Sequence, residues 1–418
     1  MKAGRTAIVA ASALVTVGML AGAARPQAST ARAAGTSSNV ITIGTLYASS
    51  GQFATSSMPE YEGLKFWAHQ VNASGGLYVK AKHKKEKVRI IAYNDQSSTT
   101  TATTLYSRLI TQNHVNMFVA DFGSVLTADA VPLAQENHVV LWDQSGSGTT
   151  FFLPSNHDHY IVLTSIQGSQ FWPDSLSKYI IHNKIKKVSI VYDANDFTGA
   201  QNTTLVDNLK KAHITPLYDQ AIPTTTSTYS TILSSMESKK PQMLIELGYN
   251  TNDVAFFQAL SAVKNNHAKV FTIFPGQQES LFVSDVGKKA LAGTYTYLAP
   301  PLTTISGVNY GMSLAAFNKA FSKFAHTAVS KINFEDIMGY NTGLIMQKDL
   351  SVSKSLSQNA LRNAANTFSG KVTTIEGTFK INPRTGVQQG LPFPIGLFTL
   401  KGGKLGITDF TYTIQGEK

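Results

Sequence analysis

Residues 117–150 read MFVADFGSVLTADAVPLAQENHVVLWDQSGSGTT. Two apolar segments, at 117–120 and 139–142, predict short strands with a helix between them, and a loop rich in hydroxyl groups follows each strand. In an open parallel sheet, such loops lie together at the carboxyl edge, where small ligands bind. The segment therefore predicts one half of a ligand cleft, with Ser124 on the first loop and residues 145–148 on the second.

The sequence around this segment continues the alternation of strands and helices. Before it, strands are expected at 40–47 and 88–93, each followed by a helix. After it, a second series of strands is expected, at 188–192, 214–218, 243–247 and 270–273. Strands that alternate with helices indicate parallel sheets covered by helices. The predicted fold class is therefore α/β, with two Rossmann-like lobes around parallel central sheets.

The chain is expected to pass between the two lobes more than once. After an extended segment at 293–298, two helical stretches precede a β-rich tail. Several crossings at one edge would form a multi-strand hinge. The bounds that we predict are 39–160 and 299–391 for the first lobe, and 161–298 and 392–418 for the second.

The N-terminus has the layout of a secretory signal peptide. Lys2 and Arg5 precede an apolar run from 7 to 24, and small residues follow it, so we assign residues 1–33 to the signal peptide. No later segment approaches the ~20 apolar residues that span a bilayer. We therefore expect an exported protein, periplasmic or extracellular.

The composition excludes several classes of function. The chain has no cysteine, which excludes disulfides, thiol catalysis, cysteine-ligated zinc and a lipid anchor on cysteine. The net charge is +11, and removal of the four basic residues of the signal peptide leaves +7. One dense basic run, KAKHKKEK at 80–87, lacks interleaved aromatic residues, so we interpret it as a solvated loop and expect no nucleic-acid partner.

The sequence contains no convincing catalytic or metal-binding motif. A nucleophile elbow, a phosphate-binding loop and the zinc-protease helix motif are all missing. His157 and His159 would share one side of an extended segment, but no third metal ligand is evident, so a polar hinge loop is favoured. We expect no enzyme, catalytic residue, metal or cofactor.

Several longer segments resemble a known family in their order and spacing. They include ITIGTLYASSGQFATSSMPEYEGLKFWAHQVNASGGL at 41–77, VSIVYDANDFTGAQ at 188–201 and IEGTFKINPRTG at 375–386. Together they resemble the periplasmic Leu/Ile/Val-binding proteins, the type I solute-binding proteins of ABC importers. The resemblance implies a ligand held between the lobes by hinge closure and a membrane permease as partner. It also implies an amino-acid-like, amide or carboxylate ligand.

The resemblance assigns five ligand-binding residues. Ser124, Ser145 and Ser147 match positions that hold the carboxylate and amine of an amino acid, whereas Phe197 and Tyr249 match aromatic residues that close over the ligand. Taken without the family, the serines are better interpreted as turn formers and helix caps, and the aromatic residues as packing.

Three further residues are candidates for the lining of the cleft: Asp121, Phe122 and Gln277. Phe53 and Trp142 are expected near its rim, and an aromatic position of the family falls at Ser56.

Two departures from the family bear on the ligand. The acidic partner of the ligand amine falls at Gly276, and the tyrosine expected at 197 is a phenylalanine. Asp121 or Glu279 is the candidate replacement charge. Otherwise the ligand is an amide or an apolar acid, aromatic acids included, because a buried ammonium without a counter-charge is costly.

The function expected from the sequence is that of an extracytoplasmic solute-binding protein of an ABC importer. A secreted ligand sensor of the same fold is the first alternative, and a secreted hydrolase is the second.

Overall fold

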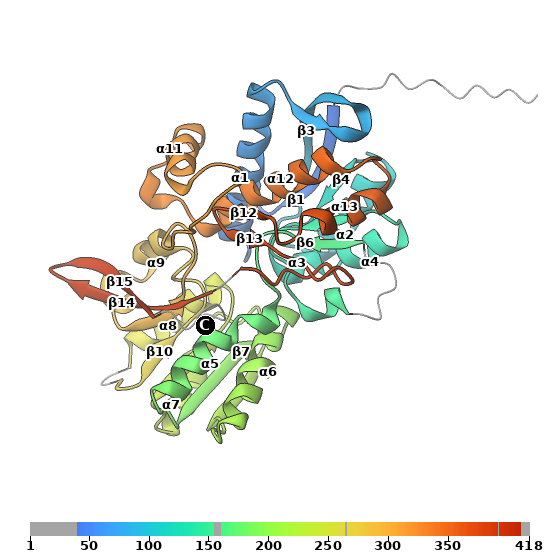
Figure 1. Ribbon diagram of the computed structural model, residues 1–418. Helices are drawn as coiled ribbons and strands as arrows, with labels where there is room; N and C mark the ends of the chain where they lie inside the picture. The colour runs from blue at the N-terminus through green and yellow to red at the C-terminus, as the bar shows by residue number, and fades with distance from the viewer. Residues whose placement is uncertain (1–39, 154–159, 264–265, 392, 411–418) are drawn as a thin grey trace, which may run out of the picture. The chain divides into compact units, whose positions relative to one another are not determined.

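The computed structural model of the protein describes residues 40–153, 160–263, 266–391 and 393–410 (Figure 1). The predicted signal peptide and the His157 and His159 pair lie outside these residues. In the described part of the chain, no helix is both long and apolar enough to cross a membrane.

The first lobe is built on a six-stranded sheet in the order β2-β3-β1-β4-β5-β6. All pairs are parallel except β2 with β3. Its strands are β1 Val40–Tyr47, β2 Leu77–Val79, β3 Lys84–Asn94, β4 Met117–Val119, β5 Leu141–Asp143 and β6 Ile161–Leu163. Strand β1 lies between β3 and β4 and is buried from Ile41 to Leu46, as expected for a central strand covered on both faces.

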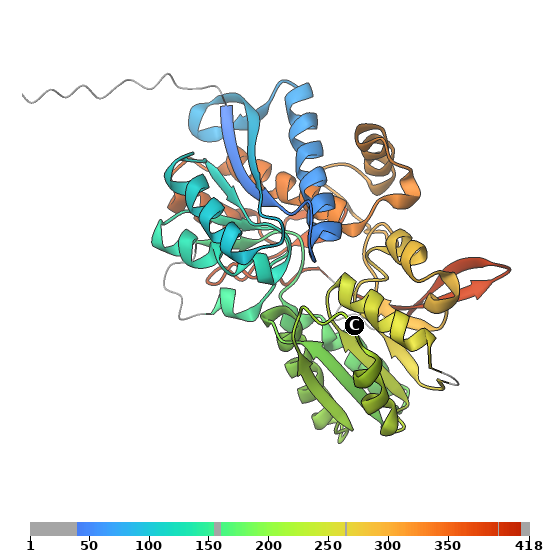
Figure 2. The ribbon, with the colours of Figure 1, turned by 180° about the vertical axis from the view of Figure 1, so that it is seen from behind.

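Helices pack on both faces of this sheet. Up to residue 153 they are α1 Ala54–Ala73, η1 Lys80–Lys82, α2 Thr99–Thr111, α3 Gly123–Thr127, α4 Ala130–Glu136 and η2 Thr149–Phe152. After residue 300 they are α11 Leu314–Ala325, η4 Val329–Lys331, α12 Phe334–Val352 and α13 Gln358–Phe368. Helices α1 and α12 lie side by side, and the view from behind shows α2 and α4 over the opposite face (Figures 1 and 2).

Two glycines permit the close crossing of α1 and α12. A Cβ on Gly63 would lie 2.0 Å from the carbonyl oxygen of Asp336, and one on Gly339 would lie 1.8 Å from that of Glu60. The backbones of the two helices therefore touch at these glycines. Met338 precedes Gly339 on α12, so this contact also positions Met338.

The second lobe is built on a seven-stranded sheet in the order β15-β14-β11-β10-β9-β7-β8. Five of its strands are parallel, and the hairpin of β14 and β15 pairs antiparallel with β11. Its strands are β7 Val188–Asp193, β8 Tyr218–Ile222, β9 Met243–Leu247, β10 Lys269–Phe271, β11 Thr294–Tyr297, β14 Ile395–Lys401 and β15 Lys404–Phe410.

Its helices are η3 Ser169–Phe171, α5 Pro173–His182, α6 Asp196–Lys211, α7 Ser230–Ser238, α8 Asn250–Ser261, α9 Glu279–Asp285 and α10 Lys288–Leu291. Helix α5 packs against α6, and α7 packs against α8. Figure 1 shows α5 and α6 in front of the sheet, and Figure 2 shows α8 on the face behind it.

One predicted strand is wrong and one predicted crossover is a strand. The strand expected at 214–218 begins at Tyr218 instead, because Pro216 has no N–H to donate to a neighbouring strand. The segment expected to cross at 293–298 is β11, which pairs with β10 and β14. The helix expected after the first strand is α1, which begins at Ala54 and contains Pro59.

The chain passes between the two sheets at several points. It leaves the first sheet after β6 and returns after β11 to form α11 to α13 and the small hairpin of β12 Val372–Thr374 and β13 Gly377–Phe379. It then re-enters the second sheet as β14. Since β6 pairs with β5, residues 161–163 belong to the first sheet, although we placed the lobe boundary before them. The predicted lobe bounds remain a prediction.

Candidate functional site

A small cavity lies where loops from both lobes meet. Its volume is about 20 Å³, which gives room for about one water molecule. It is lined by Phe122, Gly123, Ser145, Ile166, Trp172, Phe197, Tyr249, Phe274, Gln277 and Met338. Most of these side chains are apolar, and none of them is charged.

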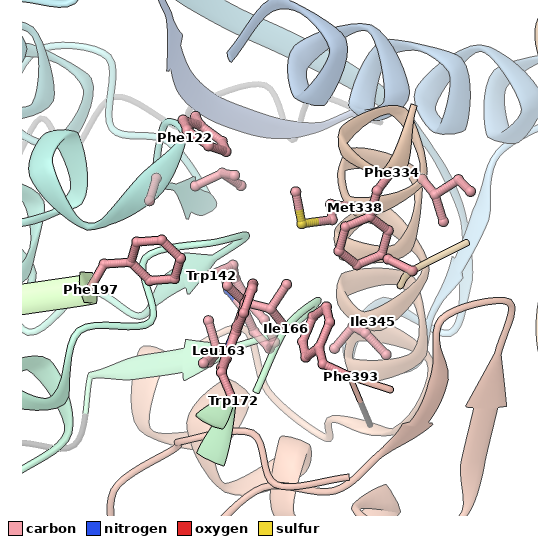
Figure 3. Close-up of a cluster of buried hydrophobic side chains, with 14 of the residues drawn as sticks. Phe122, Trp142, Leu163, Ile166, Trp172, Phe197, Phe334, Met338, Ile345 and Phe393 are labelled. Carbon is pink, nitrogen blue, oxygen red and sulfur yellow. The ribbon is translucent and has the colours of Figure 1, made fainter. Parts of the chain in front are cut away.

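The lining residues come from the ends of parallel strands. Phe122 follows β4, Ser145 follows β5, Tyr249 follows β9 and Phe274 follows β10. The carboxyl ends of parallel strands are where open α/β sheets bind ligands. Figure 3 shows Phe122, Phe197, Trp172 and Met338 around the same space, although they come from different elements.

Aromatic rings from the two lobes pack against each other at this cavity. Tyr249 lies at the centre of the cluster, with its ring centroid 5.5 Å from Phe197, 6.0 Å from Phe274 and 5.9 Å from Phe122. Phe53, which precedes α1, meets Tyr249 edge-on at 5.1 Å. Such contacts add about 0.5–1.5 kcal/mol per pair beyond the burial of area.

Local hydrogen bonds hold these aromatic residues in place. Asn195 caps α6 by accepting from the backbone N–H of Phe197 at 3.0 Å. Asp253 accepts from the N–H of Phe274 at 2.7 Å, and Asp193 accepts from that of Tyr249 at 3.4 Å. Two buried acids of the second lobe thus position two walls of the cavity.

Those acids belong to a buried cluster without a cation among its described neighbours. Burial, followed by the charge of Glu246, raises the pKa of Asp193 to about 9. Burial also raises the pKa of Asp253 to about 7 and that of Glu246 well above its usual value. The carboxyl groups are therefore largely protonated below neutral pH in the folded protein.

The predicted serines lie together, but they bond mainly to the protein itself. Ser145 lines the cavity, and its hydroxyl accepts from the N–H of Gly123 at 2.9 Å. The hydroxyl of Ser124 accepts from the N–H of Gly148 at 3.0 Å. Ser124 is outside the lining of this cavity but lines a separate hollow with Thr150 of the first lobe and Asp196 of the second. Ser147 pairs with the hydroxyl of Ser169 at 2.8 Å and also lies outside the cavity lining.

Asp121 is buried and is not among the residues that line the cavity. Its Oδ1 accepts from the hydroxyl of Ser57 at 2.5 Å and from the N–H of Phe122 at 2.7 Å. Burial and the nearby charge of Asp95 raise its pKa well above the ordinary value. Asp121 therefore holds the first loop through these bonds, and its role as a replacement charge for a ligand stays a prediction.

The other candidate charge is also outside the cavity. Glu279 begins α9 and lines a separate hollow with Lys288. Gln277, two residues earlier, does line the cavity and is buried. At the family's aromatic position, Ser56 makes a polar contact: its hydroxyl accepts from the side-chain amide of Gln278 at 2.7 Å. The ring of Phe53, three residues earlier, packs against Tyr249 in the aromatic cluster instead.

Hydrogen bonds join the two lobes at the edges of the cleft. Asp196, at the start of α6, accepts from the hydroxyl of Thr149 at 3.0 Å and from the N–H and hydroxyl of Thr150 at 2.8 and 2.6 Å. Near the other end of the aromatic cluster, the amide of Gln52 donates to the carbonyl of Thr224 at 2.6 Å.

Comparison with known proteins identifies the family to which the chain belongs. Residues 40–393 match the family model of the periplasmic binding proteins. This chain belongs to the periplasmic binding protein family. The predicted resemblance is therefore confirmed, as is the α/β fold with two lobes.

Solved structures of substrate-binding proteins share this fold. A leucine-binding protein from Thermotoga maritima is 13% identical with a TM-score of 0.74, over 88% of this chain and 97% of that one. A branched-chain amino acid transporter protein from Streptococcus pneumoniae, in complex with isoleucine, is 16% identical with a TM-score of 0.70, over 89% and 99%. A solute-binding protein of an ABC transporter from Rhodopseudomonas palustris, in complex with p-hydroxybenzoic acid, is 16% identical with a TM-score of 0.76, over 90% and 97%.

Four apolar residues of the periplasmic binding protein's cavity were not anticipated from its sequence: Ile166, Trp172, Phe274 and Met338. Phe274 directly follows the strand predicted at 270–273, and a residue at the carboxyl end of a parallel strand is a candidate for ligand contact. Met338 lies inside a long buried helix, and nothing in the local sequence distinguishes it from a core residue. Within the described ranges, no group of three or more His, Asp or Glu side chains could hold a metal ion.

Proposed function

We propose that this chain is the extracytoplasmic solute-binding protein of an ABC importer. In this proposal it captures a small amino-acid-like, amide or carboxylate ligand in the cavity between its lobes and delivers it to a membrane permease. The observation that carries the proposal is the position of the cavity, which is lined from both lobes at the carboxyl ends of the strands. Relatives of the same fold bind leucine, isoleucine and hydroxybenzoate, which are ligands of this size.

Hinge closure explains how such a cavity would select its ligand. A volume of about 20 Å³ is too small for an organic solute, so the lobes must separate before one binds. A ligand that touches both lobes only when they are together shifts the population toward the closed form. Hydrogen bonds such as those of Asp196 then contribute to the closed form alone.

The residues that we assign to ligand contact differ in part from the sequence-based set. Ser145, Phe197 and Tyr249 are retained, and Phe122 and Gln277 join them, because all five line the cavity. Ser124 and Ser147 are assigned to holding the loops, where each already has a hydrogen-bond partner. The hydroxyl hydrogen of Ser124 remains available to a ligand if the lobes close around one.

The family and the N-terminal sequence support the proposed partner and location. A protein of this family delivers its ligand outside the cytoplasm, which agrees with a signal peptide at residues 1–33 and with the lack of cysteine for a lipid anchor. The closed form is the species that the permease would recognise, since only that form carries ligand.

A thermal-shift screen tests the proposal. The panel contains branched-chain and aromatic amino acids, short amides, urea and aromatic carboxylates, each at millimolar concentration. A ligand that binds only the folded protein stabilises it by mass action and so raises its Tm. At a ligand concentration of 100 times the Kd, the gain in the free energy of unfolding is about 2.7 kcal/mol. We expect one chemical class to raise Tm, and Phe197→Ala to abolish the shift.

Phe368→Ala is the matched control, because Phe368 is buried on α13 against Phe379 and lies outside the cavity lining. That variant should lose stability and keep the ligand-induced shift. A folded wild-type protein whose Tm is unchanged by every compound would contradict the proposed function.

A further inference from the structure

Gly276, which precedes the cavity-lining Gln277, cannot carry an acidic side chain. A Cβ on Gly276 would lie 2.1 Å from the carbonyl oxygen of Tyr297, and the N–H of Gly276 donates to the hydroxyl of Thr296 at 3.0 Å. The backbone is thus held directly against β11, with no room for a side chain. A carboxylate that would pair with a ligand amine is excluded here by packing as well as by the residue type.

Gln277 takes the adjoining place in the wall and is neutral. Its backbone is fixed on both sides, since its N–H donates to the carbonyl of Phe274 at 2.9 Å and its carbonyl accepts from the N–H of Phe334 at 3.1 Å. The side chain is 3% exposed and lines the cavity. Its amide nitrogen lies 3.5 Å from the carbonyl oxygen of Ile273, a distance at the outer limit of a hydrogen bond. The amide therefore has donor capacity left for a ligand.

Two buried acids, Glu60 and Glu335, bond to neighbours of the cavity, and each keeps one carboxyl oxygen without a hydrogen-bond partner among the described residues. Burial raises the pKa of Glu60 well above its usual value and that of Glu335 to about 8, so both carboxyl groups are mainly protonated at neutral pH. Glu60 interacts with Ser145 and Gln144, and Glu335 accepts from the amide of Gln278 at 2.6 Å. Neither acid lines the cavity. An ammonium group placed among the lining residues would lose its water without gaining a counter-charge, which is strongly unfavourable.

The polar groups that do face the cavity favour a ligand oxygen. The hydroxyl of Tyr249 is buried and has no hydrogen-bond acceptor among the described residues. It lies against the backbone N–H groups of Ser124 and Val125, which are donors as well. A buried O–H donor without an acceptor is costly, so an oxygen atom of a ligand would relieve it. The remaining walls are aromatic rings and apolar side chains.

We propose that the ligand of this cavity is an aromatic compound that carries an oxygen acceptor, such as a carboxylate, and lacks an amine, and that Gln277 is the neutral position of the lining at which an amine lacks a counter-charge. The inference rests on the proposed function and narrows it to one ligand class. It predicts that removal of the amine from an amino acid improves binding.

The test compares ligands that differ only in the amine. L-Phenylalanine and 3-phenylpropanoate share the ring, the chain and the carboxylate, so their Kd values by isothermal titration calorimetry isolate the amine. We expect 3-phenylpropanoate to bind at least tenfold more tightly, and benzoate to bind as well. Choline is included because an aromatic cage without a nearby acid is also the environment that binds quaternary ammonium groups.

Substitution of Gln277 tests the residue itself. Gln277→Glu should reduce the preference for 3-phenylpropanoate over phenylalanine at least tenfold, because it places a carboxyl group on the wall. Gln277→Met keeps the length of the side chain without its amide, and should weaken both ligands without changing their ratio. Glu279→Gln is the control on the same segment and should change neither Kd, since Glu279 lies outside the cavity lining.

The outcomes separate this inference from the proposed function. If phenylalanine binds as tightly as 3-phenylpropanoate, or if choline binds most tightly, the inference is overturned and the solute-binding function stands. If the folded protein binds no member of the panel, the proposed function fails and the inference fails with it. If Gln277→Glu does not fold by circular dichroism, the wild-type comparison of the two matched ligands still decides the ligand class.

Discussion

The hydroxyl oxygen of Tyr249 lies 3.2 Å from the position that a Cβ on Gly123 would occupy, and a ring carbon of Tyr249 lies 3.1 Å from it. Tyr249 belongs to the second lobe, and Gly123 is the first residue of α3, which follows β4 in the first. The ring of one lobe therefore rests on bare backbone of the other. Gly123 also has φ +74°, in a region that residues with a Cβ rarely adopt.

Gly123→Ala should destabilise the protein for both reasons. We expect a loss of about 1–3 kcal/mol in the free energy of unfolding, because a strained backbone and a contact with Tyr249 are introduced together. Urea unfolding measures it. Gly199→Ala is the control: it lies on α6 with nothing within 4 Å of its Cβ position and should gain up to about 1 kcal/mol. Equal effects at the two glycines would refute this account.

Gly339→Ala should force α1 and α12 apart. Its Cβ would lie 1.8 Å from the carbonyl oxygen of Glu60, which belongs to the backbone and cannot rotate away. Overpacking of this kind costs about 1–3 kcal/mol. Since Met338 is the next residue and lines the cavity, ligand affinity should fall as well. Calorimetry of unfolding and of ligand binding checks both effects, and an unchanged Tm would mean that the crossing is looser than described.

Asp196→Ala should favour the open form. The variant removes the carboxylate that accepts three hydrogen bonds from Thr149 and Thr150 across the cleft. We expect the Kd for ligand to rise about tenfold, which corresponds to ~1.4 kcal/mol, and the radius of gyration of the ligand-free protein by X-ray scattering to increase. Asp207→Ala, at an exposed position of the same helix, should change neither quantity. An effect of equal size at Asp207 would point to net charge as the cause.

The stability of the protein should fall as the pH rises. The pKa of Asp193 is raised to about 9, by burial and then by the charge of Glu246, and that of Asp253 is raised to about 7. Between the ordinary pKa near 4 and these values, the folded protein holds protons that the unfolded chain has lost. Unfolding then releases protons, so the free energy of unfolding decreases with increasing pH, and the decrease from Asp193 ends near pH 9.

Urea unfolding at pH 5, 7 and 9 measures this slope. Asp193→Asn removes one of the titrating groups and should flatten the slope between pH 4 and 9, with Glu246 and Asp253 still contributing. The loop that carries Tyr249 should loosen at high pH in the wild type, because its N–H donates to Asp193. A free energy of unfolding that rises from pH 5 to 9 would contradict the assignment.

The predicted elements were recovered where the local pattern is strong. Strand β1 has the predicted bounds, Val40–Tyr47, and the strand expected at 243–247 is β9, Met243–Leu247. Both are mainly apolar segments with turn residues beside them. The strand at 214–218 was placed too early because the apolar residues before Pro216 resemble a strand, and only the pairing of Ser189 with Tyr218 shows where the strand begins.

The candidate site was predicted only in part. Phe197, Tyr249, Ser145, Phe122 and Gln277 line the cavity as the resemblance implied they could. Their contact with ligand remains a prediction. The hydroxyl groups of the other two serines illustrate the limit, since a serine at a strand end can serve a ligand or a neighbouring loop, and the sequence is the same in both cases.

The sequence by itself determined the alternation of strands and helices, the lack of disulfides and the family to which the chain belongs. These properties depend on residue type and on spacing along the chain, which are local. The tertiary structure alone decided that Trp172, Phe274 and Met338 line one cavity and that Asp121, which bonds to Ser57, does not. It also decided that Gly276 has no space for a side chain. Such properties depend on packing between segments that are far apart in the chain, and no spacing within one segment encodes them.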